Sequence, residues 1–77
     1  MNIEELVVGS VYIVVDDTSG DRADSGERIE LLAYTLLKYM GIADNKAQAF
    51  EIIDTGQPQI RVNVRPAVIY SHILLAM

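Results

Sequence analysis

The chain has 77 residues, so we expect one domain covering residues 1–77, with no room for an enzyme assembled between two domains. Its composition, 51% hydrophobic and 22% charged, excludes intrinsic disorder. The absence of cysteine and the single histidine exclude disulfides, thiolate nucleophiles and zinc sites of the usual kind. We therefore expect a small folded protein that has no metal, no cofactor and some apolar surface buried against another chain.

Negative charge is concentrated in the first part of the chain. The net charge is −5, and residues 1–30 contain eight acidic residues against two arginines. Such a field repels nucleic acid and anionic lipid and favours a basic partner surface. The N-terminus has no basic leader region and the apolar runs are too short to span a bilayer, so the sequence predicts a soluble, cytoplasmic protein with no membrane partner.

The first predicted element is a buried strand over Val7–Val15, which is rich in β-branched residues. A run of turn-forming residues follows, and it predicts a loop over Asp16–Gly26.

The next segment, Glu27–Met40, fits two structures. Its apolar residues fall on one helical stripe, Asp24 and Glu27 have the spacing of a capping box, and Gly41 stands where a glycine after the helix would. This pattern predicts a helix over about residues 25–40. Residues 28–31 also alternate as a strand would, so a strand is the alternative.

A hairpin is predicted farther on, with arms Phe50–Asp54 and Gln59–Val64 around the turn Thr55–Pro58. The second arm alternates in polarity, which indicates a sheet with one solvated face. Its inward residues are Ile60, Val62 and Val64, and its outward residues are Arg61, Asn63 and Arg65.

The last part of the chain is apolar. Pro66 ends the preceding strand, and Val68–Ile73 predicts a short final strand or one or two helical turns. We expect the tail Val68–Met77 to close the sheet of its own molecule, and the alternative is a homodimer that pairs this edge or the stripe Ile29–Met40 with a second copy. The two apolar stretches should therefore meet either each other or a second chain.

Two stretches carry a family resemblance. Gly9–Gly20 with Gly26–Leu31 is similar to a first strand, a long irregular loop and a second strand, and Phe50–Val68 is similar to a last hairpin followed by a short 3₁₀ turn. Together they resemble the small Src-homology-3-like β-barrels, in particular short bacterial and phage-encoded members. The resemblance implies an α+β or mostly β fold with a barrel-like antiparallel sheet.

The segment Ala33–Lys46 departs from that family pattern, because it is longer and more apolar than the tip of a barrel hairpin. Two architectures therefore stay open, a barrel that carries an inserted helix and a β-α-β-β sheet with one packed helix. The resemblance implies that ligands dock along Asp16–Glu27, and it carries over no catalytic residue.

Two motifs could indicate enzymatic chemistry. Asp54-Thr55-Gly56 matches the signature of aspartic proteases, with Asp17 as a candidate second carboxylate, but too few residues follow for a catalytic lobe. The motif is also ordinary turn chemistry. His72 has only Ser71 beside it, and a strand would point the two side chains to opposite faces, so a structural histidine is favoured. We predict no enzymatic activity.

A weak divalent-cation site is a further alternative. The interval Asp16–Glu27 has the length of an EF-hand loop, but it has Gly20 at position 5 and Asp21 at position 6. Mutually repelling carboxylates in a solvated loop are favoured over a site among Asp16, Asp17, Asp21 and Asp24.

These patterns favour a non-enzymatic protein-binding module, similar to the accessory proteins with which phages bind and inhibit or redirect a host protein. An acidic edge would meet a basic surface of that partner. The alternative is a barrel that binds single-stranded nucleic acid through Arg61 and Arg65, with Lys46 beside them and Tyr12, Tyr34, Tyr39 and Tyr70 as stacking candidates. The predicted partner-binding residues are Tyr12, Asp16, Asp17, Asp21, Asp24, Glu27 and Tyr34.

Overall fold

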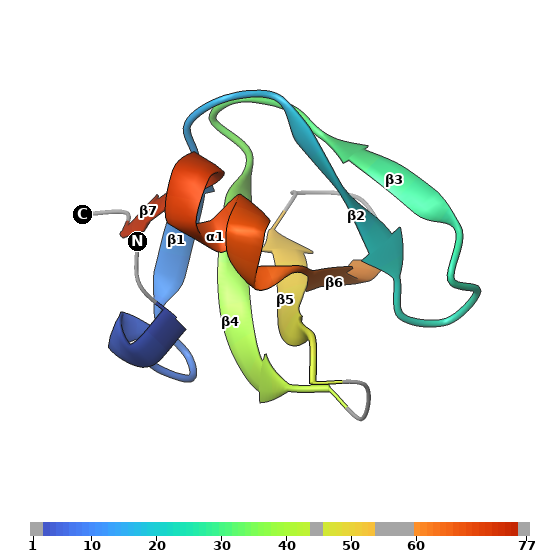
Figure 1. Cartoon of the computed structure of the whole chain (residues 1–77), viewed down its shortest axis with the longest axis horizontal. Helices are drawn as coiled ribbons and strands as arrows, with labels where there is room; N and C mark the ends of the chain where they lie inside the picture. Colours follow the sequence, from blue (N-terminus) through green and yellow to red (C-terminus); the bar gives the residue numbers. More distant parts are fainter. Residues whose placement is uncertain (1–2, 44–45, 54–59, 76–77) are drawn as a thin grey trace.

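The computed structural model describes residues 3–43, 46–53 and 60–75, and this part of the chain is mostly β (Figure 1). Seven strands form one antiparallel sheet in the order β3-β2-β6-β5-β4-β1-β7. The elements are the 3₁₀ helix η1 (Ile3–Glu5), β1 (Val11–Val14), β2 (Thr18–Arg22), β3 (Arg28–Leu31), β4 (Leu36–Ile42), β5 (Gln48–Ile53), β6 (Ile60–Val64), α1 (Pro66–His72) and β7 (Ile73–Leu75).

The centre of the sheet is the meander β4-β5-β6. Strands β1 and β7 extend it beyond β4, and the hairpin β2-β3 extends it beyond β6, so the chain crosses from one flank of the meander to the other after β1 (Figure 1). Among the described residues, β3 and β7 are the two edges and do not pair with each other. The expected antiparallel sheet with one packed helix is confirmed. In the described part of the chain the sheet does not close into the expected barrel, because its two edge strands are not paired. The helix stands between β6 and β7 along the chain.

One hydrophobic core joins both flanks of the sheet. The ring of Phe50 lies at its centre, with ring-centroid distances of 6.2 Å to Tyr12 and 5.3 Å to Tyr39. The two apolar stretches of the sequence meet in this core, as expected, because β3, β4, α1 and β7 all contribute to it. The buried hydrophobic residues are Tyr12, Val14, Leu31, Leu37, Tyr39, Phe50, Val62, Val64, Ile69 and Ile73.

The predicted helix over residues 25–40 is wrong. These residues form β3, a turn and the start of β4. The apolar residues fit a strand as well as a helix, because Leu37 and Tyr39 alternate toward the core, and β4 gains ladder partners on both sides, from β1 and β5. Gly41 adopts a φ of 111° at a register shift between Tyr39 and Gly41, so it serves a β-bulge and not a helix end.

The predicted loop Asp16–Gly26 contains a strand, β2. The turn-forming composition of this segment gave no sign of a strand. Strand β2 forms because its backbone can approach β6 closely at Gly20. A Cβ atom at Gly20 would lie 2.5 Å from Cγ2 of Val62 and 3.0 Å from the carbonyl oxygen of Asn63. Only glycine lets β2 lie this close to β6.

The predicted first strand, Val7–Val15, is too long. Val7 to Ser10 form a turn in which the Ser10 N–H donates to the Val7 carbonyl at 3.0 Å, and Gly9 has a φ of 90°. Strand β1 keeps only residues 11–14, of which Tyr12 and Val14 point into the core.

The last hairpin is confirmed, with arms β5 and β6 and with Val62 and Val64 buried while Arg61 is exposed. Its predicted turn, Thr55–Pro58, lies outside the described residues, as does the motif Asp54–Gly56. The tail forms the two turns of α1 and then β7, which pairs with β1 of the same chain. In the described part of the chain, no helix is long and apolar enough to cross a membrane.

Candidate functional site

The predicted acidic edge is divided into two surfaces by the hairpin β2-β3. The tip surface comprises the hairpin turn, residues 23–27, and the groove beside it along β6. The base surface comprises the linker Asp16–Asp17, the turn Leu32–Thr35 between β3 and β4, and their apolar neighbours. In Figure 1 the two lie at opposite ends of β2 and β3. The edge therefore carries two binding candidates and not one.

The tip surface carries Asp21, Asp24 and Glu27. Asp24 is paired with Arg22 through two hydrogen bonds, of 3.0 Å from Nε and 2.9 Å from Nη2, and this bonding lowers the pKa of Asp24 to about 2. It also raises the pKa of Arg22. Glu27 is exposed, and its backbone N–H donates to Ser25 Oγ at 3.2 Å, which shapes the turn. The tip is thus fixed by local polar contacts.

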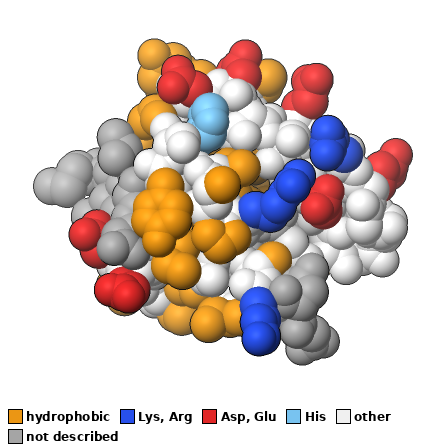
Figure 2. Space-filling view, viewed as in Figure 1, with side chains coloured by type: hydrophobic (Ala, Val, Ile, Leu, Met, Phe, Trp, Pro, Cys, Tyr) orange, Lys and Arg blue, Asp and Glu red, His pale blue; other side chains and the backbone are white. Residues whose placement is uncertain are grey.

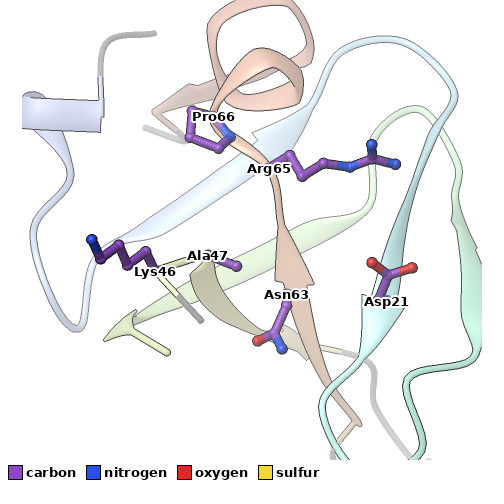
Figure 3. Close-up of a pocket in the computed structure, with 6 residues that line it drawn as sticks. All are labelled: Asp21, Lys46, Ala47, Asn63, Arg65 and Pro66. Atoms are coloured by element: carbon purple, nitrogen blue, oxygen red, sulfur yellow. The ribbon is translucent and has the colours of Figure 1, made fainter. Parts of the chain in front are cut away.

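An open hollow separates the hairpin from the turn between β4 and β5 (Figure 3). The side chain of Arg65 extends from the end of β6 toward β2, from which the carboxylate of Asp21 projects, and Lys46 lies on the other side of β6. Neither cation forms an ion pair with Asp21 within the ranges that the structure describes. The hollow is lined by Asp21, Lys46, Ala47, Asn63, Arg65 and Pro66.

A second hollow adjoins the first at Asn63 and extends the groove to Arg61. Arg61 and Asn63 alternate on the outward face of β6, and Arg65 follows directly after the strand, so the extended backbone spaces the polar groups along the groove. The predicted basic stripe of Arg61, Arg65 and Lys46 therefore lines one continuous groove. The rest of the second hollow is lined by Ala23, Met40, Ile42, Ala43 and Ala49.

The base surface is organised around Tyr34. Its side chain is 77% exposed, and its backbone has a φ of 72°, a conformation that bulky residues rarely adopt. The Tyr34 N–H donates to the Val14 carbonyl at 2.6 Å, and the Asp17 carboxylate accepts the N–H of Ala33 at 2.8 Å. Asp17 is therefore a turn-fixing residue as well as an acidic surface group.

Exposed aliphatic side chains surround Tyr34. They are Leu32, 56% exposed, with Leu36 and Ile53, which face each other across β4 and β5. An apolar groove runs between them and Ile60, with Glu30 at its rim. Hydrophobic and acidic side chains lie together at the upper edge of Figure 2, where the linker and this turn cross in Figure 1. The sequence held one signal for this patch, since residues 31–37 carry no charge on either face of a strand.

The four tyrosines predicted as anchors or stacking residues divide into two that are buried and two that are exposed. Tyr12 is 1% exposed and its hydroxyl accepts the N–H of Val7 at 2.9 Å, so its ring belongs to the core and cannot anchor a partner. Tyr39 is also buried, its hydroxyl donates to Gln48 Oε1 at 2.5 Å, and burial, with a smaller contribution from Tyr12, raises its pKa. Tyr34 and Tyr70 are the two tyrosines that are exposed.

The predicted structural histidine His72 has a buried Nδ1 with no hydrogen-bond partner among the described residues, and its backbone carbonyl accepts the N–H of Val15 at 2.8 Å. The carboxylates proposed as a weak cation site are spread from the base to the tip of the hairpin. In residues 3–43, 46–53 and 60–75, no three histidine or acidic side chains gather as metal ligands.

No protein-family model, curated protein or solved structure matches the chain.

Proposed function

We propose that this protein is a small, non-enzymatic protein-binding module with a Src-homology-3-like plan, of the kind that phages use to bind and modulate a host protein in the cytoplasm. The strand connections support the plan, because β1 pairs with both the closing strand β7 and the first strand of the meander, and a short helix precedes β7. The hairpin β2-β3 takes the place of the long loop between the first strand and the meander.

The observation that carries the proposal is the hollow at the tip surface, where unpaired charges of both signs face one ligand space (Figure 3). Asp21 offers an anion, and Arg65 and Lys46 offer cations. A polypeptide can supply both opposite charges, a basic side chain for Asp21 and an acidic one for Arg65 or Lys46. A nucleic acid strand supplies anions alone, so it leaves Asp21 facing like charge.

The acids along the hairpin give the partner its character. Residues 16–30, which span both ends of the hairpin, contain six acidic residues against two arginines. Such a field accelerates association with a basic surface and does so most at low salt. Figure 2 shows acidic and basic side chains interspersed on the β2-β3 side of the molecule, while hydrophobic side chains gather over α1. We therefore propose that the host protein presents a basic surface, which this protein covers.

The proposal is tested with a partner captured from a bacterial lysate, identified by mass spectrometry and then purified. The double variant Asp21→Lys/Glu27→Lys leaves the Arg22–Asp24 pair in place, and we expect it to slow association at least tenfold and to flatten its salt dependence. Glu4→Lys/Glu5→Lys is the matched control, because both residues are exposed acids on η1, outside the hairpin, and the net charge changes by the same amount. Unchanged association of the double variant contradicts the proposal.

A second candidate function is the binding of single-stranded nucleic acid in the same groove, which the convergence of Arg61, Arg65 and Lys46 favours. Against it, none of the tyrosines lines either hollow of the groove, so the groove offers no stacking platform among the described residues. Fluorescence anisotropy with a labelled oligothymidine separates the two functions. Only the nucleic-acid function predicts binding that Arg61→Ala/Arg65→Ala abolishes.

A further inference from the structure

We infer that the base surface is a second docking site, which takes a basic segment of another protein that carries a large apolar side chain. The site goes beyond the function proposed above, because it uses none of the tip residues. It would make this small protein a two-sided connector. The inference depends on three features of the base surface: a fixed backbone, an exposed apolar groove and an acidic rim.

The backbone that presents Tyr34 is fixed from several directions. Strand β1 and the turn exchange two hydrogen bonds, from the Tyr34 N–H to the Val14 carbonyl at 2.6 Å and from the Val14 N–H to the Thr35 carbonyl at 3.0 Å. Asp17 adds the bond to the N–H of Ala33. These contacts keep a bulky residue at a φ of 72°, where a free chain would rarely place it. A surface ordered before binding loses less entropy when a ligand arrives.

The groove beside Tyr34 is apolar and open. Tyr34, Leu32 and Leu36 contribute from the turn and β4, and Ile53 and Ile60 close the groove from the facing hairpin. Tyr34, Leu32, Leu36 and Ile53 are all exposed. Large side chains exposed together around a concave site, with a tyrosine at the rim, are typical of surfaces that bind proteins. The occupant of this groove is therefore an apolar side chain.

The rim decides which kind of partner fits. A hollow adjoining the groove is lined by Asp17 and Glu30 with Thr18 and Ser19, and Asp16 is exposed beside it. Arg28 is the one cation among the residues that line these two hollows. A lysine or arginine next to the docked apolar side chain would meet these carboxylates. A second copy fits less well, because a two-fold contact places the acidic rim of one molecule against the same rim of the other.

The test uses the whole chain, labelled with ¹⁵N, and a hexapeptide of sequence Lys-Lys-Phe-Leu-Lys-Lys as the probe. We expect saturable chemical-shift changes at the amides of Leu32, Tyr34 and Leu36, with a Kd below about 1 mM. Two matched peptides, Glu-Glu-Phe-Leu-Glu-Glu and Lys-Lys-Ser-Ser-Lys-Lys, remove the charge match and the apolar side chains in turn. Each should bind at least tenfold more weakly, and equal binding of either overturns the inference.

Variants of Tyr34 separate docking from folding. Tyr34→Gly removes the ring but suits the positive φ, so the protein should stay folded while its Kd for the probe rises at least tenfold. Tyr34→Phe keeps the ring and should bind within twofold of the parent protein. Glu30→Lys should weaken binding through charge alone, whereas the tip variant Asp21→Lys/Glu27→Lys should bind the probe normally.

Two further results would overturn the inference. One is full affinity of folded Tyr34→Gly for the probe. The other is a concentration-dependent dimer, measured by sedimentation of the parent protein without peptide, that Tyr34→Gly abolishes, because the groove would then be a contact between two copies. Unchanged partner association of the tip variant Asp21→Lys/Glu27→Lys, with probe binding retained at the base, contradicts only the function proposed for the tip.

Discussion

The two ends of the hairpin β2-β3 differ in what holds them in place. At the base, Leu31 is 1% exposed and lies in the core, and the adjoining turn is bonded to β1. At the tip, Asp21 and Arg22 of β2 pair with Asn63 and Val62 of β6, and the remaining contacts are the exposed pair of Arg22 with Asp24, local turn bonds, and the bond from the Ala23 N–H to the Arg61 carbonyl at 3.0 Å. One hairpin therefore carries a charged end held by backbone and polar contacts, suited to attracting a partner, and an end held by the core, suited to binding one.

The largest expected effect comes from removing the core contact at the base. Leu31→Ala deletes a buried side chain and should lower the free energy of unfolding by about 3 kcal/mol, measured by urea denaturation. Its neighbour Leu32 is exposed, so Leu32→Ala is the matched control and should change stability by less than about 0.5 kcal/mol. Equal effects of the two variants would mean that the base is not pinned by the core.

The next effect tests the docking of the hairpin on the meander. Gly20→Ala forces a methyl group against Val62 and the backbone of Asn63, and should cost about 2 kcal/mol through overpacking. Hydrogen exchange should accelerate at the amides of β2 more than at those of β4. The control is Ser19→Ala on the neighbouring position of β2, and a destabilisation by Gly20→Ala no larger than that of Ser19→Ala would refute the close approach.

A smaller effect reports on the strained turn at the base. At a φ of 72° glycine is favoured over alanine, so Tyr34→Gly should be more stable than Tyr34→Ala by about 1 kcal/mol. Thermal denaturation of the two variants measures this difference directly. The reverse order of stability would show that the turn does not hold a left-handed backbone in solution.

The smallest effect concerns the tip. Asp24 has a folded pKa of about 2 against an ordinary value of 3.8, mainly because of its hydrogen bonds to Arg22. The pair therefore stabilises the folded state above pH 3.8, and this contribution is lost as the pH falls from about 3.8 to about 2. NMR titration of the Asp24 carboxyl group should give the low value, and Arg22→Ala should return it toward 3.8. An unchanged titration in that variant would exclude the pair in solution.

The regular patterns of the sequence predicted part of the fold correctly. The alternation of residues 60–65 predicted β6 and its faces, because a period of two is unique to strands. The helix prediction for residues 27–40 failed because their apolar residues satisfy both the helical and the strand period. Hydrogen bonding of β4 to β1 and β5 decides in favour of a strand. Strand β2 was missed because a polar strand that depends on one glycine has no hydrophobic signature.

The sequence also predicted only part of the candidate sites. The sequence by itself determined the acidity of residues 16–30, the absence of thiolate nucleophiles, and the outward position of the arginines at and after β6. These properties follow from composition and local spacing. Only the tertiary structure decided that Tyr12 is core, that Tyr34 is exposed on a strained turn, and that the acidic edge divides between two surfaces. Burial and the pairing of distant strands are properties of the whole sheet. A local sequence pattern therefore does not determine whether the rest of the chain buries a given tyrosine.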